Sequence, residues 1–291
     1  MKGIILAGGT GTRLYPMTLA MNKQLLHIYD KPMIYYPLST LMLAGIQDIL
    51  IISSQDSQPN FEKLLGNGNH LGLNISYQQQ EKPNGIAEAF IIGEEFISND
   101  PCALILGDNV FHGQGLGKLL SRCAELETGA KIFATWVSDP ERYGVIDLDK
   151  DGNIRGLIEK PKVAPSNWAV AGLYFFDYNV SSIAKSISPS PRGELEILDV
   201  IKQYLEEDKL EIEKLGRGYA WLDTGTPQSL LEAATFVQTL QQRQGLGICC
   251  PEEIALSQKF ISLKQFKILA KKYSSSEYGK LLNKTIQDTS K

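Results

Sequence analysis

The chain opens with a short apolar segment that runs directly into a glycine-rich loop, and this junction limits the available folds more than any other feature. Residues 1–14 read MKGIILAGGTGTRL, and Lys23 follows ten residues after Arg13. The segment Lys2–Ala7 predicts a strand, and glycines after a strand let backbone N–H groups approach an anion closely. Arg13 and Lys23 add fixed positive charge, and the arginine fork suits phosphate oxygens. The first 25 residues therefore predict a binding site for a triphosphate.

Two better-known glycine loops are poor matches. A dinucleotide-binding fingerprint needs G-x-G-x-x-G, and Leu14 stands where the third glycine would be. A Walker A loop needs Gly-Lys-Ser or Gly-Lys-Thr, which the chain lacks. A tight turn with incidental glycines is the remaining alternative. Phosphate binding is favoured over it because Thr12 and Arg13 are attached to the loop and Lys23 follows.

Composition excludes several classes of protein. The 291 residues are 43% hydrophobic and 21% charged, with a net charge of −4, so no global attraction to nucleic acid or an anionic membrane is expected. No segment approaches the ~20 apolar residues that span a bilayer, and the N-terminus does not resemble a signal peptide. We therefore expect a cytoplasmic protein. The four cysteines and three histidines show no zinc-binding spacing.

Short β-branched segments alternate with helical segments in the first half of the chain. The expected strands are Lys2–Ala7, Asp48–Ser53, Asn74–Gln79, Cys102–Gly107 and Lys131–Val137. The expected helices are Met33–Ala44, Asn60–Leu65, Ile86–Ile97 and Leu116–Thr128. This alternation is typical of an α/β fold with a Rossmann-like, mostly parallel central sheet flanked by helices on both faces. Ligands of such sheets bind at the carboxyl ends of the strands.

The second half of the chain has a different pattern. Closely spaced strands are expected at Tyr143–Leu148, Ile154–Lys160 and Ala169–Phe176, and they form a β-rich insert on the parallel core. The segments expected after this insert are a helix at Leu195–Glu207, strands at Leu210–Lys214 and Tyr219–Leu222, and a long helix at Pro227–Gln244. From Gly245 onward we expect helical pieces and a polar tail.

Two aspartates stand at the exits of expected strands. Asp108 follows the segment ALILG, and Asp223 follows YAWL. Mg²⁺ in proteins takes one or two carboxylates together with phosphate oxygens and waters. Either aspartate alone is better explained as the cap of the turn or helix that follows it. Because the same chain carries a phosphate loop, metal binding by the two together is the favoured interpretation.

The tripeptide Glu-Lys-Pro occurs twice. The charges at 81–83 lie in a polar loop and are expected to be solvated, whereas Glu159 and Lys160 end an expected strand and can face a cleft. A carboxylate that accepts sugar hydroxyls beside a lysine that holds a phosphate would suit a sugar phosphate. Tripeptides repeat by chance, so this signal is weak by itself. The pair Tyr143-Gly144 permits close approach of a ligand, and the start of a strand explains it equally well.

The segment Leu6–Leu14, with Pro16 and Lys23, resembles the signature of the sugar-1-phosphate nucleotidyltransferases. Residues 23–38, KQLLHIYDKPMIYYPL, are similar to the bacterial branch of that family that uses dTTP and glucose 1-phosphate. Supporting segments are GIAEA at 85–89, LGDN at 106–109, YGV at 143–145, EKP at 159–161 and WLDTG at 221–225. The likeness extends over residues 1–255 and is looser beyond. Thr10 and Asn22 stand where serine is common in the family.

This resemblance implies roles for the matching residues. The nucleotide-binding residues would be Gly8, Gly11, Thr12, Arg13, Lys23, Gln80, Gly85 and Asp108, of which Gln80 and Gly85 would read the pyrimidine edge. The sugar-phosphate-binding residues would be Asn109, Tyr143, Gly144, Glu159, Lys160 and Val170, with Lys160 on the phosphate. Asp108 and Asp223 would hold Mg²⁺. The catalytic residues would be Arg13, Lys23, Asp108 and Asp223, with Arg13 stabilising the departing pyrophosphate.

The resemblance also implies a reaction and an organisation. The reaction is transfer of a thymidylyl group from dTTP to α-D-glucose 1-phosphate, by in-line attack on the α-phosphorus. Residues 1–240 would form the nucleotidyltransferase domain, with a nucleotide-binding half at about 1–130 and a sugar-binding half at about 131–240. Residues 241–291 would be a helical segment for regulatory or oligomer contacts in a homotetramer.

Three alternatives remain open at this point. The chemistry could use UTP or another nucleotide or sugar. The chain could be a non-catalytic sensor of nucleotide sugars, although the presence of Arg13, Lys23, Asp108 and Asp223 together argues against it. The chain could also be a dinucleotide-binding oxidoreductase, although Leu14 at the place of the third glycine argues against it.

Overall fold

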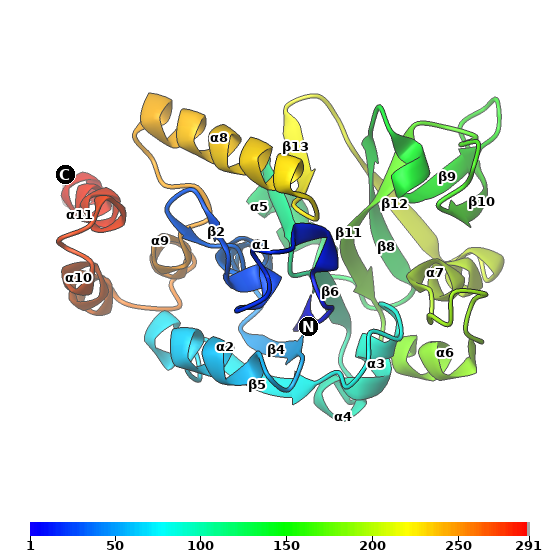
Figure 1. Cartoon of the computed structure of the whole chain (residues 1–291), viewed down its shortest axis with the longest axis horizontal. Helices are drawn as coiled ribbons and strands as arrows, with labels where there is room; N and C mark the ends of the chain where they lie inside the picture. The colour runs from blue at the N-terminus through cyan, green and yellow to red at the C-terminus, as the bar shows by residue number, and fades with distance from the viewer. Residues whose placement is uncertain (290–291) are drawn as a thin grey trace.

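A nine-stranded sheet runs through the molecule in the computed structural model, which describes residues 1–289 (Figure 1). The strand order is β10-β9-β11-β6-β1-β4-β5, and β8 and β12 extend the sheet from the other edge of β11. The strands are β1 (Lys2–Ala7), β4 (Asp48–Ser53), β5 (Asn74–Gln79), β6 (Cys102–Leu106), β8 (Ala130–Trp136), β9 (Gly144–Leu148), β10 (Ile154–Glu159), β11 (Trp168–Phe176) and β12 (Leu210–Leu215).

Four strands from the first half of the chain are parallel, and the inner three, β6, β1 and β4, are largely buried on both faces. β6, β1, β4 and β5 pair in parallel register. Neighbouring side chains of a strand point to opposite faces, and Ile4 and Ile5 are both fully buried. Helices α1 (Tyr35–Leu43), α2 (Gln58–Leu65) and α5 (Leu116–Cys123) pack on the face of Ile5. Helices α3 (Glu88–Ile92), α4 (Glu94–Ile97), α6 (Val180–Ser186) and α7 (Ile197–Glu206) pack on the face of Ile4. The predicted α/β class with a mostly parallel central sheet is confirmed.

One edge of β11 is shared by two strands. Residues Leu173–Phe176 pair antiparallel with β6, whereas Ala169 pairs with Val145 of β9. Residues 170–172 lie between these two ladders and pair with neither. The sheet therefore divides where β6 ends and β9 begins, at the carboxyl end of the parallel strands.

A small ribbon lies beside this division. Strand β7 (Asn109–Gly113) follows β6 after a two-residue turn and pairs antiparallel with β13 (Tyr219–Asp223). Helix α8 (Pro227–Gln244) follows β13, and its first turn is closed by a capping box between Thr226 and Ser229. A short hairpin of β2 (His27–Ile28) and β3 (Lys31–Pro32) packs against α8. The sequence pattern did not predict strand β7 or its pairing.

The helix predicted at Ile86–Ile97 is wrong in one respect, since it is divided at Gly93 into α3 and α4. A Cβ at Gly93 would stand 3.0 Å from the Ala89 carbonyl oxygen and from Ile4, so the backbone lies directly on the sheet there. The C-terminal segment forms the expected helical pieces, α9 (Pro251–Ser257), α10 (Leu263–Lys272) and α11 (Glu277–Thr289). Figure 1 shows these helices at the α1 side of the molecule, away from β9 and β10. None of the helices in the described part of the chain combines the length and apolar character needed to cross a membrane.

Candidate active site

The glycine loop after β1 carries Arg13 across to the loop after β13. Gly9 and Gly11 have φ angles of +90° and +60°, a region that favours glycine. The following turn, Thr12–Leu14, is anchored by the fully buried Leu14. A Cβ on Gly225 would stand 2.9 Å from Nη2 of Arg13, so the guanidinium group lies against the loop that follows Asp223.

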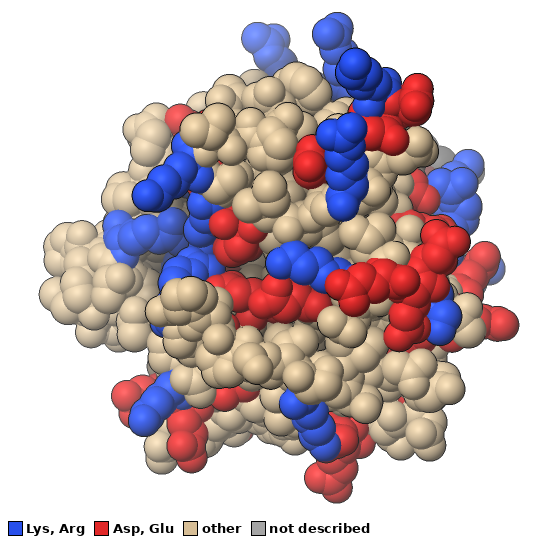
Figure 2. Space-filling view, turned by 90° about the vertical axis from the view of Figure 1, so that its right-hand side faces the viewer, with Lys and Arg blue, Asp and Glu red and all other residues tan. Residues whose placement is uncertain are grey.

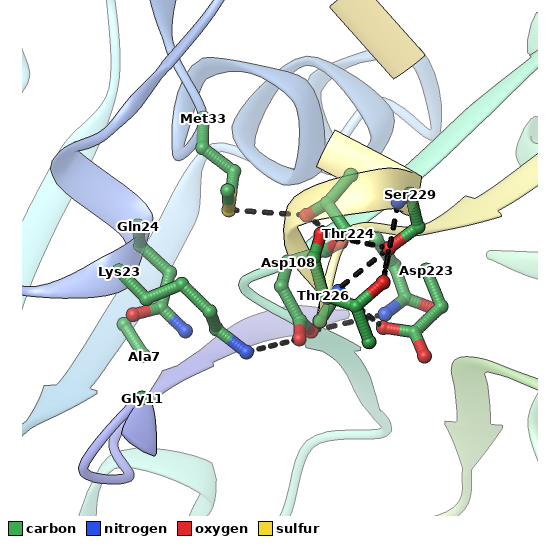
Figure 3. Close-up of polar contacts among 12 residues, drawn as sticks. Ala7, Gly11, Lys23, Gln24, Met33, Asp108, Asp223, Thr224, Thr226 and Ser229 are labelled. Carbon is green, nitrogen blue, oxygen red and sulfur yellow. Dashed lines mark hydrogen bonds and ion pairs between the residues drawn. The ribbon is translucent and has the colours of Figure 1, made fainter. Parts of the chain in front are cut away.

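Lys23 is held in place by the residue before it. The Asn22 side chain accepts a hydrogen bond from the Gln24 N–H at 2.8 Å and so caps the turn that contains Lys23. Its Nδ2 donates to the Ala7 carbonyl oxygen at 3.1 Å, which ties this turn to the end of β1. Lys23 then forms an ion pair with Asp108, and the two side chains are only 14% and 13% exposed (Figure 3).

The two predicted metal-binding aspartates are brought together by the β7–β13 ribbon. Asp223 is the ladder partner of Asn109, the residue after Asp108. Beyond the ladder, the N–H and the hydroxyl of Thr224 both donate to the Asp108 carbonyl oxygen, at 3.1 and 2.8 Å. The Asp223 carboxylate accepts the Gly225 N–H at 3.1 Å (Figure 3). Both carboxylates therefore belong to one hydrogen-bonded unit, although 115 positions separate them in the chain.

The two aspartates differ in their electrostatics. Burial raises the pKa of Asp108, but the charge and hydrogen bond of Lys23 and the hydrogen bond of Asn109 outweigh it, so the net shift is downward. The pKa of Asp223 is raised, first by burial and then by the negative charge of Asp108. Lys23, Arg13 and Arg142 oppose that shift. One carboxylate is thus stabilised as an anion by its ion pair with Lys23, while the other has Arg142 at 3.8 Å.

A cavity of about 280 Å³ opens at the division of the sheet. Its lining contains all six residues predicted for the sugar phosphate, together with three of the four predicted catalytic residues. These lining residues are Asn109, Tyr143, Gly144, Glu159, Lys160, Val170, Arg13, Asp108 and Asp223. We refer to this cavity of about 280 Å³ as the division cavity. On the face that carries β9, β10, α6 and α7, acidic and basic side chains lie side by side (Figure 2).

Polar groups inside the division cavity are positioned by neighbours from distant segments. The Trp221 indole N–H donates to Oδ1 of Asn109 at 2.6 Å, and its ring packs edge-on against Tyr143 with centroids 5.0 Å apart. Glu159 is paired with Lys160 at 3.2 Å and with Arg192 at 3.2 Å. The orientation of Asn109 and the position of the Glu159 carboxylate are therefore set by the surrounding structure.

A second cavity of about 370 Å³ lies along the glycine loop. Gly9, Thr10, Lys23 and Gln80 contribute to its lining, and we refer to it as the loop cavity. Lys23 faces this cavity and Asp108 faces the division cavity, so their ion pair lies between the two spaces.

The remaining predicted nucleotide residues support the loop rather than line either cavity. Gly8 is pressed against the Gln80 side chain, and Gly85, with φ +111°, lies against the backbone of Leu195. Gly11 and Thr12 form the start of the turn that carries Arg13. Gly8, Gly11, Thr12 and Gly85 therefore lie apart from the residues that line the division cavity and the loop cavity.

Several residues of the site were not predicted. They are Asn22, Arg142, Arg192, Trp221 and Thr224. Arg142 lies 3.8 Å from Asp223 and lines the division cavity. The sequence did contain a signal for Trp221 and Thr224, because both flank Asp223 in the segment used for the resemblance. Arg192 lies in a polar loop, where a charged side chain is ordinarily solvated, so no local signal marks it.

The carboxylates suit a divalent cation that is also bound by phosphate. Residues 1–289 contain no group of three or more His, Cys, Asp or Glu side chains arranged to hold a metal ion. Asp108 and Asp223 supply two hard oxygen ligands, and Mg²⁺ sites at substrate phosphates commonly use one or two protein carboxylates. The pKa of Asp223 is raised first by burial and then by the like charge of Asp108, and a bound cation would offset both.

Comparison with known proteins places the chain in a family. The family model described as nucleotidyl transferase matches residues 2–239. A glucose-1-phosphate thymidylyltransferase of Xanthomonas campestris pv. campestris is 56% identical over 281 residues, covering 97% of this chain and 95% of that protein. The enzyme of the same name from Mycobacterium tuberculosis is 52% identical over 282 residues, covering 97% of this chain and 98% of its own.

Solved structures agree with this placement. A candidate glucose-1-phosphate thymidylyltransferase from Bacillus anthracis, in complex with sucrose, superposes with a TM-score of 0.74 at 40% identity, covering 81% of this chain and 94% of that one. A UDP-glucose pyrophosphorylase bound to UDP-glucose superposes with a TM-score of 0.72 at 25% identity, covering 82% of this chain and 98% of that one. The phosphate loop, the paired carboxylates and these likenesses together show that the chain belongs to the nucleotidyl transferase family.

Proposed function

We propose that this protein transfers a thymidylyl group from dTTP to α-D-glucose 1-phosphate and releases pyrophosphate. The observation that carries the proposal is the Lys23–Asp108 ion pair, which lies between the loop cavity and the division cavity. A triphosphate held at the glycine loop and a sugar phosphate held in the other cavity would meet at this pair. The names and nearly full-length coverage of the relatives support the choice of substrates.

In this proposal the cations of the site act on successive phosphates. Lys23 neutralises charge near the α-phosphorus, and Arg13 stabilises the departing pyrophosphate, since a guanidinium fork suits two phosphate oxygens. Lys160 holds the phosphate of the sugar substrate. Asp108 and Asp223 would hold Mg²⁺, which when bound supplies positive charge to the phosphate oxygens.

The sugar substrate is held by the polar groups of the division cavity. Glu159 accepts hydrogen bonds from sugar hydroxyls and Asn109 forms hydrogen bonds with them, while Tyr143, Gly144 and Val170 shape the wall. The attacking group is a phosphate oxygen, and a phosphate monoester has a second pKa of about 6, so it is largely ionised near neutral pH. No general base is then required. Catalysis comes from alignment and from stabilisation of charge in an in-line transition state.

The same proposal divides the chain into a nucleotide half at about 1–130, a sugar half at about 131–240 and a C-terminal segment at 241–291. Gly8, Gly11 and Thr12 bind the triphosphate through the loop backbone, and Gln80 and Gly85 read the base. We further propose a homotetramer in the cytoplasm. Sedimentation of the purified protein tests the assembly, and a species of one chain's mass, 32.2 kDa, would exclude it.

A pyrophosphate-release assay tests the proposed reaction. The purified protein is given glucose 1-phosphate, Mg²⁺ and each of dTTP, UTP, dCTP, dATP and dGTP in turn, with galactose 1-phosphate as a second sugar. Release with dTTP that requires glucose 1-phosphate and is abolished by a chelator supports the proposal. Release that is fastest with UTP would reassign the nucleotide. If no combination of nucleotide and sugar phosphate releases pyrophosphate, the remaining candidate is a protein that binds nucleotide sugars without catalysis.

A further inference from the structure

We propose that Glu88 is a positioning residue that fixes the orientation of the Gln80 carboxamide and thereby selects the base. This inference rests on the proposed function, in which Gln80 reads the pyrimidine edge. Glu88 lies at the start of α3 and is half-buried behind Gln80, and it lines neither the division cavity nor the loop cavity. It would therefore act through Gln80.

The amide nitrogen of Gln80 is fully used by two acceptors. Its Nε2 donates to Oε2 of Glu88 at 2.7 Å and to the Gly85 carbonyl oxygen at 3.4 Å. Neither a carboxylate nor a carbonyl group can donate a hydrogen bond in return. Turning the carboxamide over would place its oxygen against both of them and leave three acceptors facing one another. The network therefore allows one orientation of Gln80.

This orientation presents the amide oxygen to the loop cavity. A Cβ on Gly8 would stand 2.4 Å from Oε1 of Gln80, so the oxygen lies against the glycine loop. Gln80 lines the loop cavity together with Gly9 and Thr10. Within residues 1–289, the hydrogen bonds of the Gln80 side chain are made by its nitrogen, and its oxygen receives none. An acceptor is thus offered to whatever occupies this end of the cavity.

An acceptor at this position discriminates between bases. Thymine and uracil carry a hydrogen on N3, whereas cytosine presents a lone pair at N3. The fixed Oε1 of Gln80 complements the first and opposes the second. A neutral glutamine at position 88 could offer either an oxygen or an N–H group to Gln80, so both orientations of Gln80 would become accessible. Because the Glu88 carboxylate can only accept hydrogen bonds, it removes the second orientation together with the Gly85 carbonyl oxygen.

Binding of nucleotides without sugar tests this inference. Affinities for dTTP and dCTP are measured by calorimetry with Mg²⁺ for the wild type, Glu88→Gln and Glu88→Ala. Asn84→Ala is the matched control, because Asn84 donates to the other oxygen of Glu88 at 2.8 Å, while the hydrogen bonds of the Gln80 side chain go to Gly85 and Glu88. We expect the dTTP:dCTP affinity ratio to fall about tenfold in both Glu88 variants, the effect of one misplaced hydrogen bond. The ratio should be unchanged in Asn84→Ala.

The ratio separates positioning from a merely structural role. Loss of structure would weaken both nucleotides equally, so a wild-type ratio in both Glu88 variants would overturn the inference. A wild type that shows no preference for dTTP over dCTP would also overturn it. If the wild type prefers dTTP and the Glu88 variants lose that preference, the inference stands even when no nucleotide sugar is formed. The absence of nucleotide-sugar formation would then count against the proposed function alone.

Discussion

Replacing Lys23 with methionine tests how the centre of the site is held together. Lys23 is the cation paired with Asp108, and both side chains are close to fully buried. Methionine keeps much of the length and the apolar stem of lysine but removes the charge. Asp108 would then keep the Asn109 hydrogen bond at 3.0 Å and lose its counterion.

The size of the effect follows from this burial. Removing one partner of a buried ion pair costs about 3–5 kcal/mol, because an uncompensated charge remains inside. The Asn109 hydrogen bond and the 13% exposure of Asp108 lower the expected cost to about 2–4 kcal/mol. In a chain of this size that corresponds to a fall in unfolding temperature of about 3–7 °C. The double variant Lys23→Met/Asp108→Asn has neither charge and should recover about half or more of the loss.

Thermal unfolding followed by circular dichroism, at one pH and without ligands, measures the wild type, Lys23→Met, Asp108→Asn and the double variant. The surface pair Lys280–Glu277 is the control, because its side chains are 67% and 82% exposed and such pairs contribute at most about 1 kcal/mol. Lys280→Met should therefore unfold within about 2 °C of the wild type. If Lys23→Met is as stable as the wild type, or if the double variant is no better than Lys23→Met, the pair does not hold the site together.

Three further results are expected. Asp223→Asn should lower turnover roughly 100-fold in the pyrophosphate-release assay while the unfolding temperature does not fall, because the charge removed is already disfavoured by burial and by Asp108. Arg13→Ala should lower kcat far more than it weakens glucose 1-phosphate binding, and an unchanged kcat would refute the leaving-group role. Burial raises the pKa of Glu252, so its contribution to stability should be greatest below the unfolded value of about 4.3 and decline as pH rises. Glu252→Gln should flatten that decline in unfolding temperatures measured from pH 4 to pH 8.

The parallel strands could be predicted because their pattern is local. β1, β4 and β5 begin and end at the predicted residues. The edge strand β5 alternates polar residues with Ile75 and Tyr77, whereas β1 and β4 are apolar runs. Such runs are required where both faces of a sheet are covered, so the sequence carries the whole signal. The break at Gly93 could not be predicted, because it depends on the contact of that backbone with Ile4 of β1.

Each site residue was predicted from the end of its own strand, and the sequence could not show which of these strand ends lie together in the fold. The pairing of β7 with β13 joins segments 110 positions apart, and no periodicity within either segment indicates its partner. Asn22 illustrates a different limit. It appeared as a departure from the common serine, yet its amide caps one turn and its Nδ2 bonds the end of β1, a second contact that depends on the tertiary fold.

The division of the sheet explains why the proposed sugar-binding and metal-binding residues form one unit. A Cβ at Gly172 of β11 would stand 2.6 Å from Leu106, at the end of β6, and 2.6 Å from Oδ1 of Asn109, at the start of β7. The backbone of β11 therefore lies directly on the two residues that flank the Asp108 turn. Since Asn109 is the ladder partner of Asp223, any shift of β11 at the division moves the wall of the cavity and the paired carboxylates together. Small displacements of β11 would consequently reach the paired carboxylates through the contacts of its backbone with the Leu106 and Asn109 side chains.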